Sequence, residues 1–510
     1  MRNIRHIFLL AALIPCLANA QVAYYAAEAA RCSENLYEGS ARTIAMGNAF
    51  TALGGDLGAV SINPASTAVL RSSEFSISGN FGRSYGNASI NGNSSINSSV
   101  FNFYVPNVGV SFNFNTGNYG GLLNYSIGFV GNRTNDFNSI IDCVNSNFSQ
   151  STWLGAASCY LNGISESEVK DMSYFTNGYG VPASSLLAWD TYLISKLEGP
   201  NNEYIGSTEN IYDDLIFVGG DLDQEFYRRT RGGAYQWALN FSGNVNDCFF
   251  FGANLNLHTL DYAADEIYTE TAKTDTFDDG FKEMRHNYYQ RTTGTGVSGK
   301  FGLIYLIGGF RIGATITTPT LLNITESEEQ YMRSAFTNGR SYESTTDVRR
   351  YQYRIVSPFR FSFGAAYTFG SVGLLSVDYE RVNYGSTRLS ERGGSNTSFR
   401  DENKEISSAL GGSNIWRFGA EINLIPELAI RGGYNIFTHS GKNYIPYRSA
   451  FSVGLGYRIS ERAHVDLAYN RTGRVTSEFS LYDDYASYKA PVAKANEDKG
   501  RFILTLGLRF

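Results

Sequence analysis

The chain carries few of the side chains that usually perform catalytic or metal chemistry, and their spacing is uninformative. Beyond residue 20 there are four histidines and four cysteines, namely His258, His286, His439, His464, Cys32, Cys143, Cys159 and Cys248. They form no Cys-x-x-Cys and no His-Glu-x-x-His pattern, and the chain has no Walker loop. His258 and His464 are expected on inward strand faces beside the polar residues Asn256 and Asp466, which favours hydrogen bonding over catalysis. We therefore expect no enzyme, metal or cofactor; a hydrolase assembled across loops is the remaining enzymatic alternative.

The elements that must position these residues are long alternating strands. At the C-terminus one face holds Phe502, Leu504, Leu506, Leu508 and Phe510, and the other holds Arg501, Thr505, Gly507 and Arg509. Residues 359–369, 416–424 and 450–459 repeat this period of two. A soluble sandwich also alternates, but its strands are shorter and its outer face carries many Lys and Glu residues. Aromatic residues at the ends of the apolar rows favour a membrane barrel.

Composition excludes several classes of protein. The 510 residues carry a net charge of −6 and are only 18% charged, with 53 Gly and 10 Pro. No stretch approaches 18 consecutive apolar residues, which excludes helical membrane spans. The acidic balance and the lack of Lys/Arg clusters argue against nucleic acid as a partner.

The N-terminus predicts export. Arg2 and Arg5 precede a short apolar run, and Ala18-Asn19-Ala20 is typical of a cleavage site, so residues 1–20 are predicted to be a signal peptide. Cys16 suggests a lipoprotein as an alternative, but Pro15 occupies a position where a small residue is expected.

Fourteen strands are predicted between residues 74 and 510, and short and long connections alternate between them. Short turns are expected at 244–248, 307–308, 370–371, 425–426 and 460–462, and long loops at 134–233, 263–291, 321–347, 385–412 and 477–499. Short periplasmic turns and long extracellular loops characterise outer-membrane barrels. The predicted fold is all-β, a 14-stranded antiparallel transmembrane barrel at residues 74–510 whose largest extracellular loop is 134–233.

Residues 21–73 lack the strand pattern. Ser40 could cap a short helix, and Asn63-Pro64-Ala65 predicts a rigid bend, because proline fixes its own φ and restricts the residue before it. A barrel of fourteen strands is wider than its side chains can fill. We therefore expect 21–73 to be a hatch inside the barrel, with a disordered periplasmic extension as the alternative.

The run from Ser40 to Asp56, with Met46-Gly47-Asn48-Ala49-Phe50-Thr51-Ala52, followed by Asn63-Pro64-Ala65, resembles the N-terminal hatch of the FadL/TodX family of outer-membrane transporters. The composition resembles a Bacteroidetes-type branch, some of whose members are labelled hemin receptors. The resemblance implies passive uptake of hydrophobic, long-chain fatty acid-like molecules in the outer membrane of a Gram-negative bacterium. The implied route is a loop groove, a lumen pocket and a lateral exit. The alternative function is an assembly or secretion scaffold.

Particular residues are expected to serve this route. The family's side exit lies at a kink in its third strand, where Gly128 and Gly131 favour a bulge here. Residues 185–197 predict an amphipathic helix capped by Ser185, with substrate contacts at Leu186, Trp189, Leu193 and Leu197. The expected partners are a hydrophobic ligand, outer-membrane lipid and the barrel-assembly machinery, which would recognise the C-terminal Phe510.

The predicted topology limits which cysteines can pair. Cys143 and Cys159 share the long loop outside the cell, whereas Cys248 lies on the periplasmic side and Cys32 belongs to the hatch. A disulfide needs Cα atoms within about 7 Å, and the hydrocarbon layer is about 25 Å thick. Cys143–Cys159 is the expected bridge, with Cys32–Cys248 second and four free thiols as the alternative.

Overall fold

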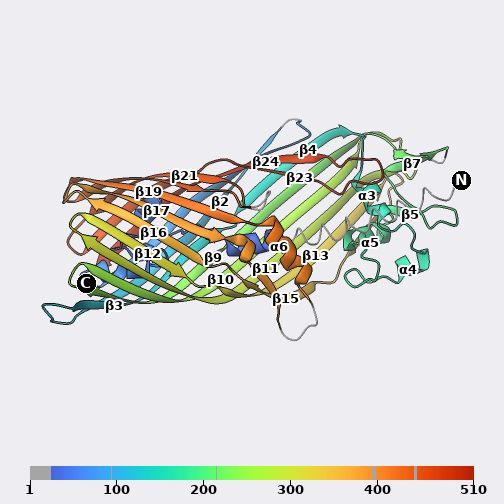
Figure 1. Cartoon of the computed structure of the whole chain (residues 1–510). Coiled ribbons are helices and arrows are strands. Elements are labelled where there is room, and N and C mark those ends of the chain that lie inside the picture. The colour runs from blue at the N-terminus through green and yellow to red at the C-terminus, as the bar shows by residue number, and fades with distance from the viewer. Residues whose placement is uncertain (1–24, 93–94, 214, 393–397, 441–444) are drawn as a thin grey trace.

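The computed structural model describes residues 25–92, 95–213, 215–392, 398–440 and 445–510. The chain forms one closed antiparallel barrel of fourteen wall strands, five of which are interrupted once (Figure 1). The wall strands are, in chain order, β1 (Glu74–Ile90), β2 (Ile96–Asn115), β3 (Leu122–Asp136) continued by β4 (Ser139–Phe148), β9 (Leu222–Val245), β10 (Phe249–Ala272), β11 (Phe281–Ile307), β12 (Phe310–Thr317) continued by β13 (Leu321–Phe336), β15 (Arg349–Val356) continued by β16 (Arg360–Thr368), β17 (Gly373–Asn383) continued by β18 (Arg388–Glu391), β19 (Gly412–Ile425), β20 (Leu428–Phe437), β21 (Arg448–Arg458), β22 (Ala463–Thr472) continued by β23 (Val475–Ser480), and β24 (Val492–Arg509).

Neighbours in sequence are neighbours in the wall, and the first and last strands close it. The β1–β24 ladder runs without a shift from Glu74–Arg509 to Ile90–Ala493. Closure removes the free sheet edges that would otherwise attract other strands. The predicted fourteen-stranded barrel is confirmed.

The two faces of the wall follow the alternation in the sequence. In β24 the even-numbered side chains face outward, and Phe502 and Leu508 are more than half exposed. The odd-numbered side chains face inward, and Ile503 and Thr505 are buried. Aromatic side chains such as Phe81 and Phe103, whose ring centroids are 5.1 Å apart, extend this outer apolar surface onto β1 and β2. Among the described residues, no helix is long and apolar enough to cross a lipid bilayer.

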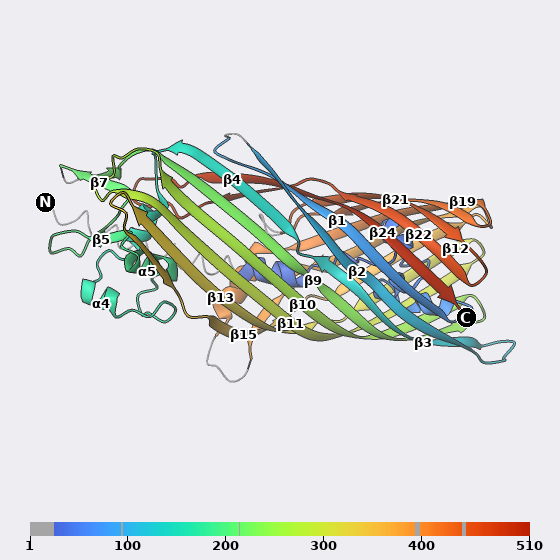
Figure 2. The same cartoon turned by 180° about the vertical axis from the view of Figure 1, so that it is seen from behind.

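The connections differ at the two ends of the barrel, as expected. The end that carries the C-terminus has short turns, and the opposite end carries the long connections (Figures 1 and 2). The wall is taller than expected at the loop end. Much of 263–291 and 321–347 is strand (β10, β11, β13), and within 134–233 the structure has β4 and the start of β9. These parts lack the apolar alternation on which the strand prediction depended, because their outer faces are polar.

The connection between β4 and β9 forms a cap over the loop end. It contains α3 (Trp153–Cys159), α4 (Glu166–Lys170), α5 (Ala183–Asp190) and two hairpins, β5 (Ile194–Lys196) with β6 (Tyr204–Gly206) and β7 (Glu209–Tyr212) with β8 (Leu215–Val218). Apolar side chains of the cap and of the upper wall share one buried core, which includes Leu154, Leu187 and Met284. Two smaller elements, β14 (Ser341–Thr345) and α6 (Arg400–Ala409), also lie in connections between wall strands, and η3 (Tyr384–Ser386) lies in the interruption between β17 and β18.

The described part of the N-terminal segment lies inside the barrel. Residues 25–33 are helical, and they are followed by α2 (Ala41–Ala45), η1 (Leu57–Ser61) and η2 (Pro64–Val69). Ser40 caps α2 by accepting a hydrogen bond from Thr43 N, and Asp56 caps η1 at Gly58 N. Figures 1 and 2 both show this segment, in blue, enclosed by the wall strands. We call residues 25–73 the hatch. The predicted signal peptide, residues 1–20, lies outside the described residues.

Candidate functional site at the seam between β2 and β3

The wall strands β2 and β3 separate above the middle of the barrel. Their ladder runs from Asn115–Asn124 to Asn107–Asn132, and residues 96–104 of β2 pair with β1 alone. β4 passes behind β1 instead of continuing beside β2. A Cβ on the inward-facing Gly86 would lie only 2.0 Å from Ile140 O, and Ser84 Oγ donates to Asn138 O at 3.0 Å. We call this separation the seam.

An extra residue in β3 produces the change of direction. Against β9, Arg133 pairs with Tyr235 and Asn135 pairs with Ala234, so Thr134 has no partner in the ladder. Such a bulge bends its strand and re-aims the residues after it. β3 then ends at Asp136, and after two intervening residues β4 begins at Ser139 along the inner side of β1.

Side chains, not ladder hydrogen bonds, close the seam. The Arg133 guanidinium carbon lies 3.5 Å from the centroid of the Tyr104 ring, which belongs to the part of β2 that has no partner in β3. Arg133 also donates to Asp136 at 3.0 Å, and Asp136 accepts from Lys499 at 3.0 Å. A stacked cation of this kind contributes about 0.5–2 kcal/mol, which is far less than a continuous ladder.

The hatch lies directly behind the seam. Glu38 N donates to Arg133 O at 2.8 Å, and Leu36 N donates to Thr134 O at 2.8 Å. The Glu38 carboxylate forms ion pairs with Arg133, at 3.7 Å, and with Arg501. Residues 36–38 therefore act as a short inner strand across the bulge.

A cavity of about 390 Å³ adjoins the seam, inside the wall. Hatch residues such as Arg31 and Glu38 line one side, and wall residues such as Asp136, Tyr262 and Lys499 line the other. Its size is within the range of small-molecule sites. The lining is mixed and strongly charged.

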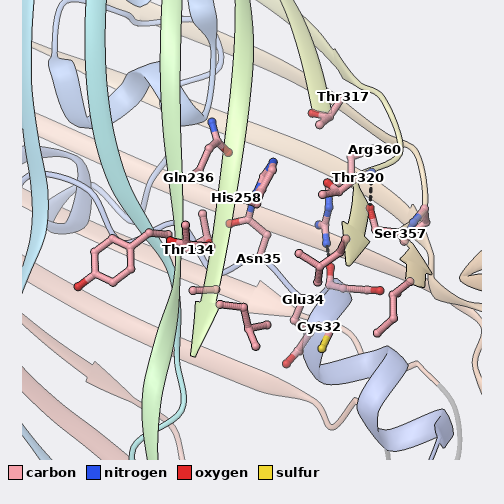
Figure 3. A pocket seen from close by; sticks show the side chains of 18 of the residues that line it. Cys32, Glu34, Asn35, Thr134, Gln236, His258, Thr317, Thr320, Ser357 and Arg360 are labelled. Carbon is pink, nitrogen blue, oxygen red and sulfur yellow. Dashed lines mark hydrogen bonds between the residues drawn. The ribbon is translucent and has the colours of Figure 1, made fainter. Parts of the chain in front are cut away.

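A second, smaller cavity of about 60 Å³ lies between the hatch and the wall, from Thr134 to the interruptions between β12 and β13 and between β15 and β16 (Figure 3). Cys32 and Glu34 approach from the hatch, and Thr320 and Ser357 belong to adjacent interruptions at Pro319 and Pro358. Thr320 N donates to Ser357 Oγ at 2.8 Å across these interruptions. The space is large enough for only a few water molecules.

Asn63, Pro64 and Ala65 join the hatch to the wall. Asn63 Nδ2 donates to Thr51 O at 2.7 Å and to Leu303 O on β11 at 3.1 Å, and Asn63 Oδ1 accepts from Ala65 N at 3.0 Å. Pro64 O accepts from Asn240 Nδ2 at 2.9 Å.

Gly128 and Gly131 are not where the strand kinks. Both lie within the unshifted β2–β3 ladder, and the bulge comes later, at Thr134. Gly131 instead provides room for a neighbour, because a Cβ there would lie 2.4 Å from the Trp237 ring. The position of the bulge depends on pairing with β9 and on the hatch, and local glycine content does not reveal it.

The helix predicted over 185–197 is shorter and begins earlier. α5 ends at Asp190, and its N-cap is Pro182, so Ser185 does not cap it. Leu186 and Leu193 are buried in the cap core, because the chain turns at Thr191 and Tyr192 and tucks Leu193 inward. Trp189 and Leu197 remain partly exposed.

All four described cysteines are free thiols, so the predicted Cys143–Cys159 bridge is absent from the structure, as is Cys32–Cys248. Cys143 does not belong to a loop but to β4, where it pairs with Phe226 of β9 and is held in the wall. Cys159 ends α3. Four free thiols was the alternative that the sequence left open.

One catalytic-type spacing, Gly82-Arg83-Ser84-Tyr85-Gly86, matches Gly-x-Ser-x-Gly. A nucleophile elbow needs a sharp strand-to-helix turn. These residues lie instead within β1, in unbroken register with β24. Among the described residues, no cluster of three or more His, Cys, Asp or Glu residues could hold a metal ion.

Solved structures share this architecture over nearly the whole chain. The toluene transporter TodX of Pseudomonas putida superimposes with a TM-score of 0.53 at 11% identity, covering 93% of this chain and 99% of that one. The chain has the TodX fold. A FadL homologue of Pseudomonas aeruginosa gives a TM-score of 0.52 at 11% identity, covering 94% and 98%. No family model and no curated protein sequence matches the chain.

Sequence reasoning missed the residues that form the seam, namely Tyr104, Arg133, Thr134 and Asp136. One signal was available. The polar run Asn132-Arg133-Thr134-Asn135-Asp136 interrupts the alternation of the third strand. The same polarity is typical of a loop, and the predicted loop therefore begins at residue 134.

Proposed function

We propose that this protein is an outer-membrane channel for the passive uptake of hydrophobic small molecules, which leave the lumen sideways through the seam. One observation carries the proposal: β2 and β3 lose their backbone pairing above Asn107 and Asn132, directly in front of the hatch and of a ligand-sized cavity. A lateral path would release an apolar solute into the bilayer without requiring it to cross water. The TodX fold and the apolar outer belt support this reading.

The hatch is proposed to be the gate. Residues 36–38 brace the bulge from inside, so their displacement would free Arg133 and Tyr104 to separate. Entry is proposed to occur at the cap. Trp189 is the partly exposed aromatic residue of α5, and its ring lies edge-on to Tyr204 with centroids 5.6 Å apart.

Deletion of Thr134 tests the seam. Removing the residue that forms this bulge restores the β3–β9 register beyond Arg133 and lets the strand continue straight, so β2 gains a partner along its upper edge. We expect uptake of a radiolabelled, uncharged polycyclic hydrocarbon to fall at least about tenfold in cells without other such channels. In the same assay, Trp189→Ser slows entry.

The matched control is Thr134→Val, which keeps the chain length and therefore the bulge. Heat-modifiable migration on a gel reports that each barrel is folded. A folded deletion variant with normal uptake would contradict a route through the seam and would favour the scaffold alternative.

A further inference from the structure

The cavity beside the seam is lined by equal numbers of basic and acidic side chains. They are Arg31, Arg228, Arg448, Lys499 and Arg501, with Glu34, Glu38, Asp136, Glu497 and Asp498. Aromatic side chains share the lining, among them Tyr85, Phe137 and Tyr262. The surface a ligand meets is therefore polar, rich in donors and acceptors, and balanced in charge.

Each basic group of the lining already has a carboxylate partner within 4.0 Å. The pairs are Arg31–Glu28, Arg228–Glu266 at 3.9 Å, Arg448–Glu34 at 2.6 Å, Lys499–Asp136 at 3.0 Å and Arg501–Glu38. Most of these pairs are at least half buried, where solvent screening is weak.

A charged ligand head is poorly matched to such a lining. A carboxylate that entered would have to take a cation from an existing pair or lie buried without one, and either outcome is unfavourable. A hydroxyl group avoids this conflict, because it donates to a carboxylate and accepts from a guanidinium or ammonium group. Glu497, which accepts from the Ser139 hydroxyl, already shows this kind of contact.

Aromatic side chains at the kink and on the outer side of the seam would contact the apolar part of a ligand. Phe137 lies at the kink, edge-on to Tyr262 with ring centroids 5.7 Å apart. The outer side of the seam carries Phe101 and Phe103, both more than half exposed. A chain leaving the cavity through the seam would contact these rings.

Building on the proposed function, we propose that the cavity selects amphiphiles whose head group bears hydroxyl groups and no net charge, in preference to fatty acid anions. The paired charges would hold the head, and the seam would hold the tail. The preference results from the balance of the lining, so a change in that balance should change the preference.

Three probes with the same twelve-carbon chain test this: 1-monolaurin, laurate and dodecylammonium, at pH 7.5. Binding is measured by titration of the full-length protein in lipid nanodiscs, with empty nanodiscs subtracted. We expect monolaurin to bind at least about tenfold more tightly than either ion.

Glu34→Gln is expected to raise the affinity for laurate, and a misfolded variant could not produce such a gain. The substitution leaves Arg448 without its partner and gives the cavity one unbalanced positive charge. We expect laurate to bind about tenfold more tightly than to the unaltered protein, the effect of one charge-assisted hydrogen bond, and monolaurin to change less than twofold. The matched control is Asp261→Asn, which frees Arg291 from a 3.1 Å pair on the exposed face and should change neither affinity.

The outcomes separate the two proposals. Tighter binding of laurate than of monolaurin to the unaltered protein, or an unchanged laurate affinity in Glu34→Gln, would overturn the head-group preference. Binding of an uncharged hydrocarbon without monolaurin would also overturn it and leave the channel standing. Binding of neither these three probes nor an uncharged hydrocarbon would reject both.

Discussion

At the scale of single residues, the Asn63 side chain makes hydrogen bonds both within the hatch and from the hatch to the wall. Its side chain is fully buried and uses both amide hydrogens and the carbonyl oxygen. The wall makes room for it: a Cβ on Gly302 of β11 would lie 1.9 Å from Asn63 Oδ1. The Asn63-Pro64-Ala65 bend therefore packs directly against Gly302 of the wall.

We expect Asn63→Ala to loosen the hatch by about 1–3 kcal/mol, because two buried carbonyl groups lose their donor and η2 loses its cap. Hydrogen exchange of residues 40–70 measures this as faster exchange in the hatch than in the wall strands. Asn63→Asp keeps the cap acceptor but places a buried carboxyl group against the same two carbonyl oxygens, so it should loosen the hatch at least as much as Asn63→Ala. Exchange unchanged in both variants would contradict the anchoring role.

At the scale of elements, the cap is joined to the barrel through buried carboxyl groups. Glu270 of β10 accepts from Thr152 Oγ1 at 2.6 Å and from Trp153 N at 2.8 Å, both at the start of α3. Glu209 of β7 lies nearby and accepts from Gly206 N at 3.1 Å. Burial, with a smaller contribution from the carboxylate of Glu270, raises the pKa of Glu209 to about 7.

This pKa predicts that the cap is more stable in mild acid. A carboxyl group with a raised pKa binds its proton more tightly in the folded state, so its stabilisation is complete below about pH 4.5 and declines until pH 7. We expect the cap to lose up to about 3 kcal/mol between pH 5 and pH 8.

Protease cleavage within residues 149–221, measured with an enzyme active across this range, should therefore be faster at pH 8 than at pH 5. Glu209→Gln cannot ionise and should remove most of the difference. Equal pH dependence in both proteins would assign the effect to another group.

At the scale of the whole molecule, a wide barrel is filled by a hatch fastened with buried charges. Arg42 of the hatch pairs with Glu421 of the wall at 3.0 Å, and Glu34 of the hatch pairs with Arg448 of the wall at 2.6 Å. Lys300 of the wall donates to Ser61 O at 2.5 Å. Breaking such buried pairs is costly, so spontaneous loss of the hatch is disfavoured.

Removing residues 21–60 should open the lumen to ions, because fourteen strands enclose more space than side chains fill. We expect stepwise conductance from the truncated protein in planar bilayers, against a closed baseline for the full chain. Recognition of the exposed Phe510 by the assembly machinery stays a prediction, so equal amounts of both proteins in the outer membrane must be shown first. A closed baseline from the assembled, truncated barrel would contradict the gate.

The amino-acid sequence by itself determined the architecture of this protein. Alternation in strands such as β21 and β24, with turns at positions such as 425–426 and 460–462, defined a closed barrel of fourteen strands with an N-terminal segment left over. Period-two patterns and turns are local, and a lipid-facing surface imposes them on every strand, so one chain is enough to read them. Ser40 was likewise recognisable as a cap from the sequence.

Only the tertiary structure decided where β2 and β3 separate and which side chains of the cap are buried. The bulge at Thr134 exists because β9 and residues 36–38 of the hatch pair around it, and these segments are about a hundred residues away on either side. Leu193 lies in the core because the cap and the upper wall share one buried cluster. The charge balance of the cavity likewise arises from side chains of the hatch and of distant strands that only the closed barrel brings together.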